Sequence, residues 1–308
     1  MIWISGCSLR KSFLKWSGAL LVALTISVKC SAQLFSKLSI NGEIQSLDKR
    51  WDLVDTVGGQ TFRLEPYQPI YILLGRWSSS PNRQPQGQSP EYSLDEPISL
   101  DVVESKFQIS LKTKIAQGIF NNKGDLWVGY TQLAAWQVYN KPFSRPFREL
   151  NYEPELIFNY PLDFNLFSFK AKMAGVAFNH ESNGQSLPLS RSWNRVIFHF
   201  AMEKEGWQII LRPWYVIKGN DEDNPDAADY IGRAELTVIH AFGSHMIYAV
   251  GRHPFKYLSR GSLELNWIFP IKGNLRGHIQ YFAGYGETLI DYRHYQNTFG
   301  IGISLIDW

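Results

Sequence analysis

Residues 275–308 read LRGHIQYFAGYGETLIDYRHYQNTFGIGISLIDW, and in two parts of this stretch large apolar residues alternate with polar or small ones. Side chains two positions apart in a β-strand point to the same face, so the alternation predicts strands over 275–284 and 295–306. The apolar face is Leu275, Ile279, Tyr281, Phe299, Ile301, Ile303 and Leu305, and the other face is Arg276, His278, Gln280, Gly300, Gly302 and Ser304. This pattern is typical of a barrel wall that separates lipid from a polar interior.

Ten further segments show the same period-two pattern and are also predicted as strands. They are 69–79, 104–116, 125–138, 153–160, 166–180, 194–203, 207–217, 232–241, 245–251 and 261–268. The connections between the strands alternate in length. The long ones are 80–103, 139–152, 181–193, 218–231, 252–260 and 285–294, and the short ones are 117–124, 161–165, 204–206, 242–244 and 270–274.

Long loops at one end and short turns at the other describe an even-stranded, up-and-down barrel. We therefore predict an all-β fold, a 12-stranded antiparallel transmembrane β-barrel of the outer membrane, with residues 33–308 as a single domain. The alternative is a soluble sandwich or a lipocalin-like barrel. Such a fold would not need to confine its long loops to one end.

The N-terminus has the pattern of a secretory signal peptide. Three basic residues precede an apolar run at 16–28, and small residues follow it at 30–32. The run is shorter than the ~18 residues that a spanning helix needs, so a cleaved signal over residues 1–32 is favoured over a membrane anchor. Segment 33–68 would then lie on the periplasmic side of the barrel.

Removal of residues 1–32 changes the composition in two respects. Both cysteines, Cys7 and Cys30, lie in this segment, so the remaining chain would have no thiolate for nucleophilic chemistry or for soft metals. The segment also holds four of the 31 basic residues and none of the 28 acidic ones, which leaves 27 basic residues against 28 acidic ones. The excess of positive charge belongs to the signal, and no nucleic-acid partner is expected.

Polar residues interrupt an apolar strand face in the stretch AGVAFNHESNGQSLPLSRSWNRVIFHF, residues 174–200. His180 and Ser182 have the parity of the apolar face of one strand, and Asn194 has that of the apolar face of the next strand. If the two strands pair, the three side chains lie together on the outer wall. A serine hydroxyl, an imidazole base and a group that orients the imidazole can form a nucleophilic triad for acyl transfer. The alternative is a polar loop that rises from the strand ends.

The run NHESNGQSLPLSRSWNR, residues 179–195, resembles the active-site segment of the outer membrane phospholipase A family, whose members are calcium-dependent barrel lipases. Further pieces resemble the same family in order and spacing. They are YTQLAAWQ at 130–137, PFRELNYEPEL at 146–156, RPWYVIKGNDEDNPD at 212–226 and GYGETLIDY at 284–292. The resemblance extends from about residue 130 to the C-terminus.

The resemblance implies a role for each polar residue of the wall. It implies that His180 is the proton acceptor, that Ser182 is the nucleophile and that Asn194 orients the imidazole. The backbone N–H of Gly184 would bind the oxyanion. An amide fixes the imidazole tautomer but stabilises the imidazolium less than a carboxylate does, so another group must stabilise the charge.

The resemblance also implies one Ca²⁺ per monomer, bound at the interface of a homodimer. The implied ligands are Gln185 and Ser190, with Ser144 of the partner subunit, and Asp223 would belong to a further site used by the monomer. Oxygen ligands in three long loops at one end of the barrel suit a hard ion such as Ca²⁺. Leu187 stands where an acidic residue is expected, which would weaken calcium binding. The alternative for the run around Asp223 is a solvated acidic loop.

The implied function is calcium-dependent hydrolysis of the sn-1 and sn-2 acyl esters of phospholipids and lysophospholipids, that is, phospholipase A1 and A2 activity. The active-site loops would lie on the extracellular side of the outer membrane. Gln132 has the parity of a lipid-facing residue, and the resemblance implies that it pairs across the dimer interface; alternatively it reaches water near the membrane boundary. The competing function is a non-enzymatic outer-membrane barrel, either a pore or an adhesin.

Overall fold

The computed structural model describes residues 44–54, 61–218, 223–306 and 308, so the predicted signal peptide at 1–32 lies outside the described residues. The strands are β1 (Leu64–Pro66), β2 (Ile70–Ser78), β3 (Val103–Ala116), β4 (Asp125–Trp136), β5 (Glu149–Leu166), β6 (Phe169–Ser182), β7 (Ser192–Lys204), β8 (Trp207–Ile217), β9 (Ala234–Phe242), β10 (His245–His253), β11 (Ser262–Lys272), β12 (Leu275–Tyr285) and β13 (Tyr295–Ile306). The short helices are α2 (Leu47–Trp51), α3 (Ala227–Tyr230), η1 (Pro90–Tyr92) and η2 (Leu289–Asp291). In this part of the chain, no helix is both long enough and apolar enough to cross a membrane.

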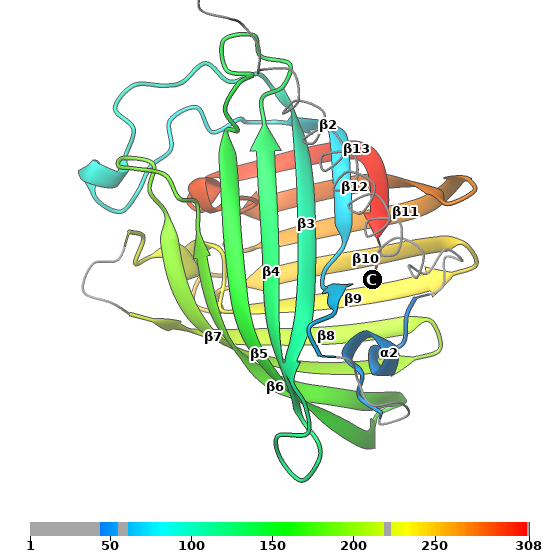
Figure 1. The fold of residues 1–308 in the computed structure, drawn as a ribbon. Helices are drawn as coiled ribbons and strands as arrows, with labels where there is room; N and C mark the ends of the chain where they lie inside the picture. Colours follow the sequence, from blue (N-terminus) through cyan, green and yellow to red (C-terminus); the bar gives the residue numbers. More distant parts are fainter. Residues whose placement is uncertain (1–43, 55–60, 219–222, 307) are drawn as a thin grey trace, which may run out of the picture. The chain divides into compact units, whose positions relative to one another are not determined.

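The strands form one antiparallel sheet that closes into a barrel (Figure 1). Each strand from β3 to β13 pairs with the next, and β2 closes the sheet by pairing with both β13 and β3. β1 and β2 pair with successive stretches of β3, because Pro66 lies opposite Leu111 and Tyr71 lies opposite Gln108. β1 and β2 therefore occupy the same place in the order of strands around the barrel, and the chain between them is not in the sheet. The predicted 12-stranded antiparallel barrel is confirmed.

The observed strands lie close to the predicted ones, but the turn predicted at 161–165 is wrong. β5 runs through this segment, and the chain reverses at Phe167, which has a φ of 52°. Proline has no N–H for the sheet and usually marks a turn or a bulge. Here the register shifts between Pro161 and Phe164, so the strand bulges and continues.

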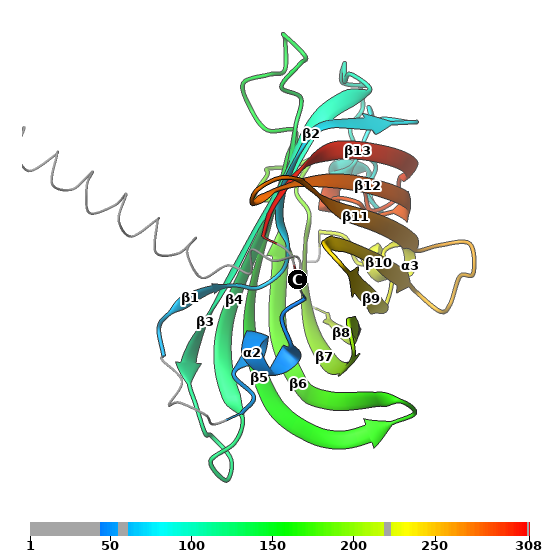
Figure 2. The ribbon, with the colours of Figure 1, turned by 90° about the vertical axis from the view of Figure 1, so that its right-hand side faces the viewer.

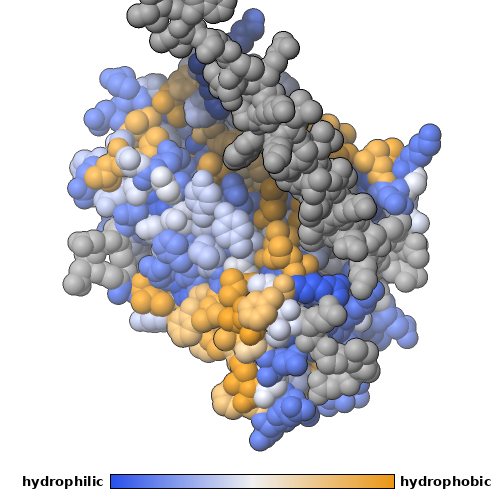
Figure 3. Space-filling view, in the orientation of Figure 1, coloured by the Kyte–Doolittle hydropathy of each residue, from blue (hydrophilic) through white to orange (hydrophobic). Residues whose placement is uncertain are grey.

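Large apolar side chains cover the outer wall. On β13, Phe299, Ile301 and Leu305 are exposed, whereas the alternate residues Thr298 and Ser304 are buried in the barrel. This is the arrangement expected of a wall that faces lipid. In Figure 3, hydrophilic residues predominate at the upper left, where the long loops lie, and hydrophobic residues gather in the lower centre.

Helix α2 packs against the barrel wall near the short turns (Figure 2). Its residues Leu47 and Trp51 are buried, and the backbone N–H of Leu47 donates to Glu203 Oε2 at 2.7 Å. The guanidinium of Arg50 lies 4.9 Å from the ring centroid of Trp308. The helix and the last residue of the chain therefore fill the short-turn end of the interior together.

Toward the long loops, the interior is filled by paired charges. The Arg76 guanidinium binds Glu287 and also Glu104, the latter at 2.6 Å, and Lys106 Nζ lies 3.1 Å from Glu287 Oε1. Arg148 Nε lies 2.8 Å from Glu104 Oε2. Burial of these charges is tolerated because each has partners of opposite sign.

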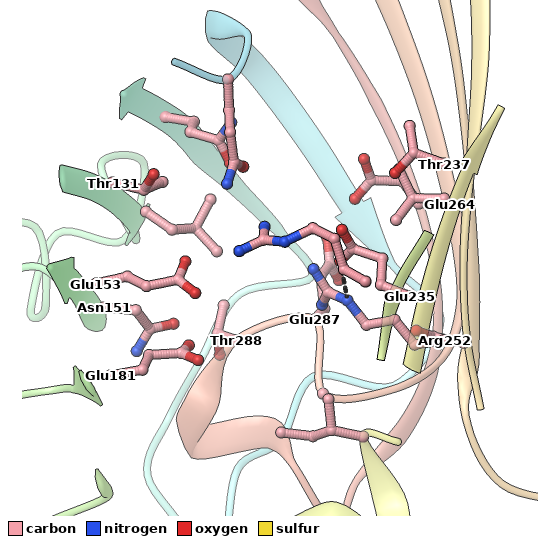
Figure 4. Close-up of a pocket in the computed structure, with 18 of the residues that line it drawn as sticks. Thr131, Asn151, Glu153, Glu181, Glu235, Thr237, Arg252, Glu264, Glu287 and Thr288 are labelled. Carbon is pink, nitrogen blue, oxygen red and sulfur yellow. Dashed lines mark hydrogen bonds and ion pairs between the residues drawn. The ribbon is translucent and has the colours of Figure 1, made fainter. Parts of the chain in front are cut away.

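An interior cavity of about 120 Å³ lies between the two filled ends. Figure 4 shows Glu153 and Glu181 projecting into it from one side of the barrel, and Glu264 and Arg252 from the other. The cavity is small and lined by polar side chains, so the centre of the barrel is polar, as the alternation predicted.

Candidate active site

β6 and β7 bring predicted site residues onto one patch of the outer wall. His180 lies opposite Asn194 in the ladder, and Ser182 lies opposite Ser192. His180 Nδ1 and Asn194 Oδ1 are 2.8 Å apart. The two side chains meet because opposite residues of an antiparallel pair lie only roughly 4.5–5.5 Å apart at Cβ.

The contact with Asn194 determines which imidazole nitrogen of His180 is free. The amide oxygen is an acceptor, so Nδ1 must carry the proton in this contact. In a neutral imidazole, Nε2 then has an unshared lone pair. His180 is therefore arranged to accept a proton at Nε2.

The pair faces away from the barrel interior. Phe178 and Phe198, which share the parity of His180 and Asn194, are 58% and 54% exposed, whereas the intervening Asn179 is buried. His180 and Asn194 are themselves exposed. The outward faces of β6 and β7 are thus apolar at Phe178 and Phe198. They become polar at His180 and Asn194, close to the long loop that joins the two strands.

Ser182 is the last residue of β6, on the same face as His180 and half-buried. Among the described residues, no hydrogen bond joins the Ser182 hydroxyl to His180. The structure thus brings His180 and Asn194 into contact and places Ser182 beside them. Catalytic hydrogen bonds are often long in a substrate-free enzyme, so the absence of a hydrogen bond between Ser182 and His180 is compatible with Ser182 as the nucleophile.

Gly184 lies two residues beyond Ser182 in the left-handed region, with a φ of 63°. A side chain there would be strained, and its Cβ would lie 3.4 Å from the ring of Tyr152. Gly184 is exposed, and Ser182 is half-buried. The backbone N–H of such a residue can approach a ligand closely.

The loop that contains Gly184 is held by the buried side chain of Asn183. Its Oδ1 accepts from the backbone N–H groups of Gln185 at 3.3 Å and Arg191 at 2.9 Å. Its Nδ2 donates to the carbonyl oxygen of Leu189 at 2.8 Å. One buried amide therefore fixes both ends of the loop.

Glu149 supports the same loop from β5. This buried carboxylate accepts from Asn183 Nδ2 at 3.3 Å and from Gln185 Nε2 at 2.6 Å. Its other oxygen accepts from Asn151 Nδ2 at 2.7 Å and from the backbone N–H of Ile290 at 3.1 Å. Sequence patterns did not single out Glu149 or Asn183, because their partners lie up to 141 positions away along the chain.

Two of the residues implied as calcium ligands are in contact. Ser190 Oγ donates to Asp223 Oδ2 at 2.9 Å, and Ser192 Oγ donates to the same oxygen at 2.9 Å. The hydroxyl of Tyr92 donates to Asp223 Oδ1 at 3.2 Å. Ser192 and Tyr92 were not predicted from the sequence; Ser192 could have been, because it shares the parity of Ser190 and Asn194.

The oxygen atoms around Asp223 fit a hard cation. Carboxylate and hydroxyl oxygens are ligands that Ca²⁺ accepts, and Gln185 and Ser190 lie in the loop that faces Asp223. Within the described residues, no three or more His, Cys, Asp and Glu side chains are grouped to hold a metal ion. The candidate ligands are accordingly one carboxylate with hydroxyl and carbonyl oxygens.

Ser144 and Gln132 lie apart from this cluster. The carbonyl oxygen of Ser144, in the loop between β4 and β5, accepts from Trp136 Nε1 at 2.8 Å. In the described part of the chain, no hydrogen bond joins Ser144 to Ser190 or Asp223. Gln132 lies on the outer face of β4, where its Oε1 accepts from the hydroxyl of Tyr130 at 3.3 Å.

Comparisons with known proteins agree with this fold. The family model described as Phospholipase A1 matches residues 47–305. The putative phospholipase A1 of Neisseria meningitidis is 37% identical over 284 residues, which cover 90% of this chain and 72% of that protein. The phospholipase A1 of Escherichia coli K12 is 35% identical over 246 residues, which cover 80% of this chain and 82% of that protein.

Solved structures give the same result. The outer membrane phospholipase dimer of Salmonella typhi with bound calcium superposes with a TM-score of 0.70 at 33% identity, over 80% of this chain and 93% of that chain. The outer membrane phospholipase A of Escherichia coli gives a TM-score of 0.70 at 34% identity, over 80% of this chain and 99% of that chain. The chain therefore belongs to the phospholipase A1 family and is an outer-membrane β-barrel.

Proposed function

We propose that the protein hydrolyses the sn-1 and sn-2 acyl esters of phospholipids and lysophospholipids, with Ser182 as nucleophile, His180 as base and Asn194 as the orienting residue. The observation that carries the proposal is the 2.8 Å contact between His180 Nδ1 and Asn194 Oδ1 on the lipid-facing wall. A soluble enzyme must extract its lipid from the membrane. Here the substrate surrounds the residues that would act on it.

In the first half of the reaction, His180 Nε2 removes the proton from Ser182 Oγ as this oxygen attacks the ester carbonyl carbon. The negative charge then lies on the former carbonyl oxygen, where the N–H of Gly184 donates a hydrogen bond. The intermediate collapses, the C–O bond to the lysophospholipid breaks, and its oxygen takes the proton from His180. The acyl group remains on Ser182.

In the second half, water attacks the acyl-enzyme and gives its proton to His180 Nε2. The bond to Ser182 Oγ breaks, Ser182 regains the proton, and a fatty acid leaves. Throughout, Asn194 holds the imidazole in the tautomer that leaves Nε2 free. Because Asn194 is neutral, it contributes less to the stability of the imidazolium than an aspartate would.

Charge stabilisation is the contribution we assign to calcium, one ion per monomer. Ser190, the carbonyl of Gln185 and Ser144 of the partner subunit would hold the ion in a homodimer, and Asp223 would hold it in the monomer. The chemistry that a bound Ca²⁺ supplies is electrostatic stabilisation of the oxyanion. The oxygen atoms gathered at Asp223, and the dimeric, calcium-bound relative, support this assignment.

We further propose that residues 1–32 are removed on export and that segment 33–68 lies on the periplasmic side, which puts the active-site loops at the extracellular side. In the homodimer, Gln132 would pair across the interface, and acyl chains would lie in clefts between the barrels. The competing functions are a pore and an adhesin. A pore is disfavoured by an interior that holds α2, paired charges and a cavity of only about 120 Å³.

Release of fatty acid from phospholipid in detergent micelles, measured with Ca²⁺ and with chelator, tests the proposal. We expect Ser182→Ala and His180→Ala to lower kcat by about 10³-fold or more. Ser186→Ala is the matched control, because Ser186 is an exposed serine of the same loop. Heat-dependent mobility of the barrel on gels reports folding. Full activity in folded Ser182→Ala, or no activity in the wild type with calcium, would contradict the enzyme proposal.

A further inference from the structure

An apolar hollow lies on the outer wall over β10, away from β6 and β7. Its lining includes Ile247 and Ala249 of β10, with Val238 and His240 on one side and Leu265 and Trp267 on the other. Its volume is about 390 Å³. We call this hollow, defined by those six residues, the β10 groove.

The groove exists because the outward residues of β10 are small where their neighbours are large. Ala249 lies opposite Val238 on β9 and opposite Leu265 on β11. Toward the long loops the next outward residue is Gly251, where an added Cβ would meet nothing within 4 Å. The floor of the groove is therefore low along β10, and its walls are the longer side chains of β9 and β11.

Stacked imidazole and indole rings surround the short-turn end of the groove. His240 stacks on Trp207 with ring centroids 4.0 Å apart, and His245 stacks on Trp267 at 6.0 Å. Trp267 Nε1 donates to His245 Nδ1 at 3.3 Å. In the neutral ring, His245 Nε2 therefore carries the proton and can donate a hydrogen bond.

The short turns beside these rings carry more positive than negative charge. Lys204 and Lys272 are exposed there, and Glu205 is the exposed carboxylate among them. The guanidinium of Arg276 donates to the carbonyl oxygen of Ser244 at 3.0 Å, in the turn between β9 and β10. Aromatic rings with adjacent cations are typical of the level at which lipid headgroups lie.

We propose that the β10 groove binds one phospholipid of the leaflet next to the short turns, with an acyl chain in the hollow and the phosphate at His245. An apolar hollow on a lipid-facing wall is filled most favourably by hydrocarbon, and the positive rim complements an anionic headgroup. This placement sets the ester groups at the short-turn end, whereas Ser182 lies at the long-loop end of β6. The lipid is bound there and not hydrolysed, and the inference does not depend on the proposed catalytic residues.

Native mass spectrometry of the Ser182→Ala protein, released from detergent with chelator present, tests the proposal. The probes are dioleoyl phosphatidylglycerol and dioleoylglycerol, which has the same chains without the phosphate. We expect one retained phosphatidylglycerol per barrel and about tenfold weaker retention of dioleoylglycerol. Equal retention of both probes would overturn the assignment of the phosphate to His245.

Two variants locate the bound lipid. Ala249→Leu fills the hollow and His245→Ala removes the donor, so each should lower retention about tenfold. Ala174→Leu is the matched control, because it adds the same side chain to the outer face of β6. Retention unchanged by Ala249→Leu in a folded barrel would overturn the proposal. Disulfide-linked dimers of Ala249→Cys would also overturn it, because they would show that a second copy of the chain covers the groove.

Discussion

Two of the bonded amides on the outer wall, Asn194 and Asn297, differ in the kind of partner that they bind. On β7, Asn194 Oδ1 lies 2.8 Å from His180 Nδ1, and on β13, Asn297 Oδ1 accepts from the hydroxyl of Tyr281 at 3.2 Å. Both partners satisfy an amide that faces lipid, where an unpaired polar group is costly. Only the β7 amide has a base as its partner, with Ser182 two residues further along β6. A polar residue that faces lipid is therefore no site by itself; its partner decides what it can do.

The largest difference between the two amides is expected in catalysis. Asn194→Ala should lower kcat by about 10²-fold, because the imidazole loses the contact that fixes its tautomer and orientation. Asn297→Ala should leave kcat within about twofold, since it lies beside no candidate catalytic group. Steady-state hydrolysis of a phospholipid in micelles measures both. Equal losses in the two variants would contradict the distinction.

The dependence of activity on calcium should involve the loops beside the first amide, Asn194, and can be tested at Asp223. Asp223→Asn removes a negative charge from the oxygen cluster formed with Ser190 and Ser192, so we expect about tenfold more calcium for half-maximal activity. Calorimetric titration with Ca²⁺ should show the same loss of affinity. Asp101→Asn, in another long loop, is the control for a general effect of charge. If chelation leaves the wild type fully active, calcium has no role.

The contact between Glu149 and Gln185, which supports the candidate oxyanion loop, can be tested by exchanging the two residue types. Glu149→Gln removes an acceptor of Asn183 and Gln185, and Gln185→Glu places two carboxylates together, so each should lower kcat about tenfold. The double variant restores a carboxylate–amide pair and should recover most of the activity with KM little changed. Loss of folded barrel in the single variants, with kcat per folded barrel unchanged, would show that Glu149 acts on stability alone.

Alternation of side chains predicted the barrel, the ends that carry long loops and the parity of His180, Ser182 and Asn194. These properties depend on the local rule that side chains two apart share a face. The error at Pro161 arose because the same residue marks either a turn or a bulge, and only the register with β6 distinguishes the two.

Other features of the site could not be predicted, since they depend on contacts between distant segments. Glu149 contacts Asn183 and Ile290, which lie 34 and 141 positions away, and no local pattern relates them. Helix α2 was also missed, because a single turn of five residues has too little periodicity to be recognised. Its place is set by Glu203 and by the buried ring of Trp127.

The loop between β12 and β13, beside the second amide, should matter for stability at acid pH and little for catalysis. Burial alone would raise the pKa of Glu287, but the charges of Arg76 and Lys106 outweigh it and lower the pKa to about 2. A carboxyl whose pKa is lower in the folded state stabilises the fold above its unfolded pKa of about 4.5 and loses this contribution as the pH falls toward 2. The contribution is on the order of 3 kcal/mol at neutral pH. Urea unfolding of the wild type and Glu287→Gln should therefore differ most at pH 7 and converge near pH 2; a difference that stays constant with pH would mean that Glu287 contributes through packing and not through its charge.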